Sequence, residues 1–169
     1  MAWKRRCLVL IALPWFLWVG SSSASAQGDY ARETLRGLAG VLVNIELAVS
    51  SEIEVKGLSE RIQLDVESKL EGMGIRVLSK EEVFTVKGGP LLLARVDLMK
   101  HDGKYVSFIL MQLYQHVLLI GEPREATYPA VTWSTDGLMA VLSALEDLRG
   151  LVIEEAGRFG QEFLQANPK

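Results

Sequence analysis

Two histidines, His101 and His116, are the side chains of this sequence best suited to acid–base chemistry near neutral pH. Their spacing of fifteen residues falls within one predicted β-hairpin, His101 at its turn and His116 far along its second strand. At about 3.3 Å per residue, the two imidazoles should lie tens of ångströms apart. The chain has no G-x-S-x-G motif, and its single cysteine, Cys7, lies near the N-terminus. We therefore expect a protein that is not an enzyme.

Other chemistry-bearing patterns are equally weak. No H-E-x-x-H motif, cysteine pair or calcium-type loop is present, so neither a metal nor another cofactor is expected. Gly88-Gly89 is followed by proline, which predicts a turn rather than a phosphate-binding loop. The adjacent pairs Glu81-Glu82 and Glu154-Glu155 should diverge on helical segments, and we expect them to be solvated.

A polar strip is the remaining candidate for recognition. Gln112, Tyr114 and His116 alternate along one predicted strand, so they share a face, and Arg95 lies on the neighbouring strand. These side chains could recognise a ligand together. They could equally be the polar residues that any exposed sheet face carries.

The first 26 residues have the organisation of a secretory signal peptide. A basic start precedes an apolar run at 8–20 and the small-residue cleavage motif Ala24-Ser25-Ala26. The sequence predicts a mature chain that begins at Gln27 and is exported in soluble form to the periplasm or the extracellular space, without an integral membrane span. An uncleaved anchor helix is the alternative.

The predicted mature chain, 27–169, has 15 basic and 21 acidic side chains, a net charge of −6. This balance argues against nucleic acid as a partner. Cys7 would leave with the signal peptide, so the exported chain would have no disulfide. Its length suits a single domain.

Apolar periodicity predicts an α+β fold for this domain. A period of two at 40–49 indicates a strand, a period near 3.6 at 58–72 indicates a helix, and 75–79 reads as a short strand that completes a βαβ unit. A strand at 128–134 and a long helix at 143–166 follow. We expect two layers: a mixed sheet of four to five strands with both long helices on one face.

Asp102-Gly103 predicts a two-residue type I′ turn and thereby the register of a hairpin over 91–118. Paired residue numbers then sum to 205, which places Leu92, Ala94 and Val96 on the helix-covered face. The opposite face has more large apolar groups than a solvated face needs. The predicted interaction face comprises Arg95, Met99, Val106, Phe108, Leu110, Gln112, Tyr114 and His116.

We expect this face to bind a protein partner. The simplest partner is a second copy of the chain, which would give a homodimer. An exported interaction or assembly module of the bacterial cell envelope is therefore the favoured function. The alternatives are a small carrier of an apolar ligand and, third, a hydrolytic enzyme.

The last helix shows a second stripe beside its main apolar stripe. Ile153, Gly157, Gly160 and Leu164 share this line, and glycines inside a helix cost about 0.8–1 kcal/mol each relative to alanine. These glycines suggest that another backbone approaches the helix closely, either segment 28–38 or a partner chain. The third alternative is that selection against glycine is weak here. Two further expectations concern this region: a capping box between Ser143 and Glu146, and Val131 with Trp133 on one strand face.

The segments "GLSERIQLDVESKLEGMGIRVLS", "YVSFILMQLYQHVLL" and "VTWSTDG" and the ending "FLQANPK" resemble small exported bacterial proteins of unknown function. The βαβ start is more remotely similar to the amino-terminal α/β domain of the periplasmic Tol-system propeller protein. That resemblance implies an interaction module by analogy only, because this chain lacks a propeller.

Overall fold

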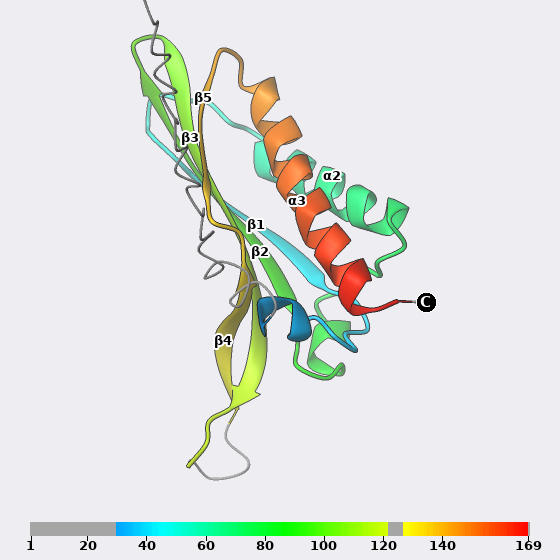
Figure 1. Ribbon diagram of the computed structural model, residues 1–169. Helices are drawn as coiled ribbons and strands as arrows, with labels where there is room; N and C mark the ends of the chain where they lie inside the picture. Colours follow the sequence, from blue (N-terminus) through cyan, green and yellow to red (C-terminus); the bar gives the residue numbers. More distant parts are fainter. Residues whose placement is uncertain (1–29, 122–126, 169) are drawn as a thin grey trace, which may run out of the picture.

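The computed structural model describes residues 30–121 and 127–168 as a mixed five-stranded sheet with two long helices on one face (Figure 1). This arrangement confirms the predicted two-layer α+β fold. The strand order is β1-β2-β3-β4, and β5 pairs with β3 beyond the end of β4. The predicted signal peptide and its cleavage site lie outside the described residues.

Strand β1 (Leu42–Val49) and helix α2 (Leu58–Gly72) match their predicted positions, and β1 pairs with β2 in parallel. The strand expected at 75–79 is reduced to one parallel bridge between Val41 and Val77. Backbone hydrogen bonds from Val41 to Arg76 and from Leu78 to Val41 make this contact. The short 3-10 helix η1 (Glu82–Phe84) follows it.

Strands β2 (Leu91–His101) and β3 (Lys104–Leu118) form the hairpin in the predicted register, from Leu91 opposite Tyr114 to His101 opposite Lys104. Asp102 and Gly103 both have positive φ, 47° and 74°, as a type I′ turn requires. The side chains expected on the helix-covered face, Val96 and Ile109 among them, are buried. The turn chemistry therefore determines which side chains face the core.

Strand β4 (Thr127–Ser134) contains a β-bulge that the sequence did not reveal. Leu113 pairs with Trp133, but Tyr114 pairs with Val131, which leaves Thr132 as the extra residue. Val131 and Trp133 therefore point to opposite faces, and the expectation that they share one was wrong. Trp133 is buried, with its ring edge-on to Phe159 at 5.0 Å between centroids.

Strand β5 (Leu138–Leu142) occupies residues expected to lead into a helix, and it extends the sheet edge along β3. Thr135 bridges the break between β4 and β5: its backbone N–H donates to Met111 O at 2.9 Å, and its Oγ1 accepts from Met111 N at 3.1 Å. The central strand thus keeps its hydrogen bonds across the break.

Helix α3 (Glu146–Ala166) starts three residues later than predicted, and no side chain caps its N-terminus, so the capping box expected between Ser143 and Glu146 does not form. The main stripe of α3 packs on the sheet. Arg149 also donates to both carboxylate oxygens of Asp65 on α2, at 2.7 and 2.9 Å, which raises the pKa of the guanidinium. The two helices are therefore joined by charge as well as by apolar contact.

Candidate functional site

The outer face of the sheet, opposite α2 and α3, is the candidate functional surface (Figure 1). Both long helices lie on the other side, and the described residues place no helix on the outer face. Its side chains come from alternate positions of β1, β2, β3, β4 and β5.

An apolar cluster occupies this face near the hairpin turn. One cross-strand row joins Met99, Val106 and Val141, and the next contains Phe108 beside Met139. Met139, Val141 and Met99 are 73%, 63% and 55% exposed. We call the cluster the outer patch; it consists of Met99, Val106, Phe108, Leu110, Met139 and Val141.

Gly137 leaves room for the Phe108 ring beside the break between β4 and β5. A Cβ at Gly137 would lie 2.8 Å from Phe108 Cε2, and the φ of Gly137 is +82°. Both features exclude larger residues at this position. Through the pairs Val106–Val141 and Phe108–Met139, the patch continues from β3 onto β5.

Charged side chains border the outer patch on the side of β1. Glu46, Arg95 and Asp97 lie on the adjoining strands, and Arg95 Nε is 3.5 Å from Asp97 Oδ2. Arg95 thus pairs with Asp97, rather than extending the predicted polar strip. A partly exposed ion pair of this kind contributes little to stability.

The polar strip itself is only partly assembled. Tyr114 Oη donates to Gln112 Oε1 at 3.2 Å. His116 is exposed at the far end of the strand, where its backbone N–H donates to Gly88 O and its ring lies beside Gly89. His101 is also exposed and lies close to Asp102 at the hairpin turn. The two histidines therefore do not share a site.

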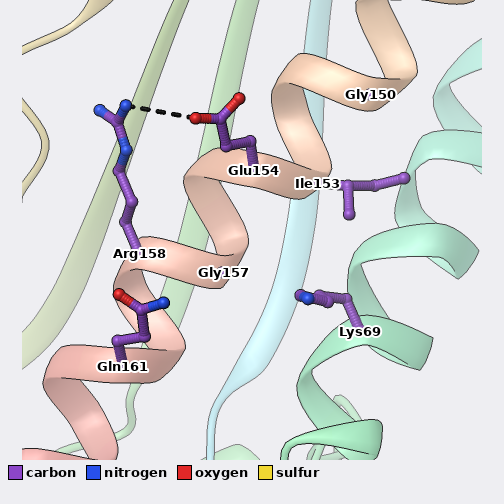
Figure 2. Close-up of a pocket in the computed structure, with 7 residues that line it drawn as sticks. All are labelled: Lys69, Gly150, Ile153, Glu154, Gly157, Arg158 and Gln161. Atoms are coloured by element: carbon purple, nitrogen blue, oxygen red, sulfur yellow. Dashed lines mark hydrogen bonds and ion pairs between the residues drawn. The ribbon is translucent and has the colours of Figure 1, made fainter.

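Gly157 and Gly160 of the second stripe of α3 face side chains of α2 and of the turn that follows it. A Cβ at Gly157 would lie 3.3 Å from Lys69 Cε, and one at Gly160 would lie 2.6 Å from Met73 Cε. Ile153 also points toward α2 (Figure 2), and Leu164 packs against the core. The glycines thus accommodate side chains of the same chain.

A surface cavity of about 450 Å³ lies between the two helices. Figure 2 shows its lining, in which Glu154 and Arg158 form an ion pair at 3.4 Å and Lys69 approaches from α2. The charged groups of α3 are exposed here. Within the described residues, no cluster of three or more potential metal-binding side chains occurs here or elsewhere.

Glu155 differs from its neighbour Glu154, and the expectation that both are solvated was wrong for it. Its side chain is 1% exposed, and its Oε1 lies 3.1 Å from Arg158 Nη1 without a hydrogen bond. Burial raises the pKa of this carboxyl group, while Arg158 opposes the rise. The sequence signal was its position: Glu155 falls between Val152 and Phe159 on the buried stripe.

Met139 and Val141 are the surface residues that sequence reasoning missed. Both belong to β5, whose residues the sequence predicts to lead into a helix. Because all five residues of "LMAVL" are apolar, the sequence shows no polar alternation that would mark which of them are exposed.

Comparisons with known proteins include a remote structural likeness. No protein-family model and no curated protein matches the chain. A solved structure of a PelC dodecamer variant from Paraburkholderia phytofirmans is 14% identical, with a TM-score of 0.45, over 76% of this chain and 90% of that chain. A likeness this remote carries no argument about function. The described helices are also too short or too polar to cross a membrane.

Proposed function

We propose that this protein is an exported, non-catalytic interaction or assembly module of the bacterial cell envelope, and that its outer patch binds a protein partner. The observation that supports this most strongly is the outer patch itself. Six apolar side chains adjoin one another on a sheet face that no described helix covers. Monomeric proteins rarely expose a contiguous apolar patch unless it binds something.

The surroundings of the patch fit the same role. Protein interfaces combine an apolar centre with a polar rim that stays accessible to water. Glu46, Arg95 and Asp97 provide such a rim on one side, and Gln112 with Tyr114 provides it on another. The separation of His101 from His116 supports a non-catalytic role, because the two imidazoles cannot act together on one substrate, and both are exposed to solvent.

Site-specific photo-crosslinking in exporting cells tests this function. A photo-reactive amino acid at Val106 should form a crosslink to an envelope protein. The same amino acid at Glu71, which is exposed on α2, is the matched control and should form none. Equal products from both positions, or none from Val106, would contradict the proposal.

Native mass spectrometry separates this function from the apolar-ligand carrier. The interaction module should show only the mass of the polypeptide, as a monomer or a dimer, with no added lipid. A lipid retained by the wild-type chain and lost in Phe108→Asp would favour the carrier instead.

A further inference from the structure

We propose that the free edge of β5 pairs with β5 of a second copy, antiparallel and centred on Ala140, so that two sheets join into one. This surface is the edge of the sheet and differs from the outer face that binds the proposed partner. Met139 and Val141 contribute backbone groups to the edge and side chains to the outer patch.

The direction of the backbone groups follows from the hairpin. His101 and Lys104 flank the two-residue turn and form a hydrogen-bonded pair, so odd-numbered residues of β3 direct their N–H and C=O groups away from β2. The two hydrogen bonds between Met111 and Thr135 agree with this alternation. Since Ser107 pairs with Ala140, β5 directs the backbone groups of Met139 and Val141 to its free side.

The free side of β5 lacks the features by which other edges avoid association. Exposed edges usually carry charges, proline or a bulge. β4 has Pro129 and the bulge at Thr132, and β1 carries Glu46 with the bridge to Val77 at its start. Leu138–Leu142 has none of these, and no described strand pairs with its free side.

The sequence of β5 suits pairing with itself. "LMAVL" has leucine at both ends and alanine in the middle. Antiparallel pairing centred on Ala140 places each Leu138 opposite Leu142 and each Met139 opposite Val141 of the second copy. Ala140 then meets its equivalent at a pair without hydrogen bonds, where Cα atoms approach to about 4.5 Å. The smallest side chain of the strand lies where the backbones come closest.

The antiparallel orientation keeps the two Asp136 side chains, which lie just before β5 in each copy, at opposite ends of the paired strands. Parallel pairing would instead bring the two aspartates together. Because five residues bury little area, we expect a weak dimer with a Kd on the order of micromolar.

Sedimentation equilibrium with the full chain tests the dimer. The wild type should dimerise at high micromolar concentration. Val141→Pro removes an outward N–H without removing a hydrogen bond to β3, and it should weaken association roughly tenfold or more. Val141→Thr keeps that N–H and is the matched control. A monomeric wild type, or equal association of the two variants, would overturn the pairing.

Disulfide trapping tests the centre of symmetry and does not depend on proline. In a Cys7→Ser background, Ala140→Cys should form a covalent dimer under mild oxidation, because the expected Cα separation permits a disulfide. Val106→Cys, at the middle of a patch row, should remain monomeric. A covalent dimer from Val106→Cys alone would place the contact on the outer face and overturn the edge pairing. Loss of the edge dimer with a retained Val106 photo-crosslink would leave the proposed function standing.

Discussion

At the scale of single residues, Val96 and Phe108 show how differently the two sheet faces depend on apolar side chains. Val96 is fully buried against the helices, whereas Phe108 is half-buried on the outer patch. Val96→Asp should cost at least about 3–5 kcal/mol of unfolding free energy, because it buries an unpaired charge. Phe108→Asp should cost about 1–2 kcal/mol and abolish partner binding. Urea denaturation measures the unfolding free energy of both variants. Equal losses of stability would show that the outer face is also part of the core.

Burial of the Glu155 side chain gives the stability of the fold a pH dependence. Burial raises the folded-state pKa of Glu155 above its ordinary value near 4.5, so the native state holds the proton more tightly than the unfolded state does. Its contribution is most favourable below pH 4.5 and is lost as pH rises through the folded-state pKa. Glu155→Gln should remove this loss, although it also ends the contact with Arg158.

Thermal melts of wild type and Glu155→Gln across pH 4 to 8 test whether Glu155 lowers the stability of the fold as the pH rises. The difference in stability should shift in favour of the variant as the pH rises. A parallel pH profile for Glu155→Gln and wild type would contradict the assignment.

At the scale of elements, two glycines of α3 should respond differently to substitution by alanine. A Cβ at Gly150 meets nothing within 4 Å, so Gly150→Ala should stabilise the protein by about 0.5–1 kcal/mol. A Cβ at Gly160 would lie 2.6 Å from Met73 Cε, so Gly160→Ala must displace that side chain and should be about 1 kcal/mol less stable than Gly150→Ala. Chemical denaturation compares the two variants.

Met73→Ala provides the control for this comparison. If the methionine end causes the crowding, Gly160→Ala should become favourable in a Met73→Ala background, and the double-mutant cycle should be non-additive. Additive effects would show that another contact limits residue 160.

Local chemistry explains which elements could be predicted from the sequence. Asp102-Gly103 determines the hairpin register, and with it the outer-face residues of β2 and β3. The stripe from Leu58 to Leu70 defines α2 because three equal apolar spacings of four residues leave little ambiguity. Both predictions depend only on residues that lie close together in the chain.

The missed features depend on contacts with distant parts of the chain. The bulge at Thr132 contains no glycine, and Thr34 Oγ1 donates to its carbonyl oxygen from the other end of the sequence. The five apolar residues of β5 fit a strand or the start of a helix equally well, and pairing with β3 decides between them. The candidate surface was therefore predicted on the hairpin and missed where β5 completes it.

At the scale of the whole molecule, the exported form should lack the first 26 residues. N-terminal sequencing and intact mass of the protein recovered from the periplasm or the medium should show a chain that begins at Gln27. Ala26→Pro should block processing and leave a heavier precursor, since small residues are required at the cleavage motif. An unprocessed wild-type chain would instead support a retained anchor.

The order of strands along the chain has a consequence for how fast the sheet forms. β2, β3 and β4 each pair with a chain neighbour, whereas β1 reaches β2 only through the long crossover that contains α2. Short-range contacts close early and parallel pairings across long loops close late. We expect the three antiparallel strands to form the folding nucleus. Destabilising substitutions in β3 should slow refolding, and those in β1 should mainly accelerate unfolding.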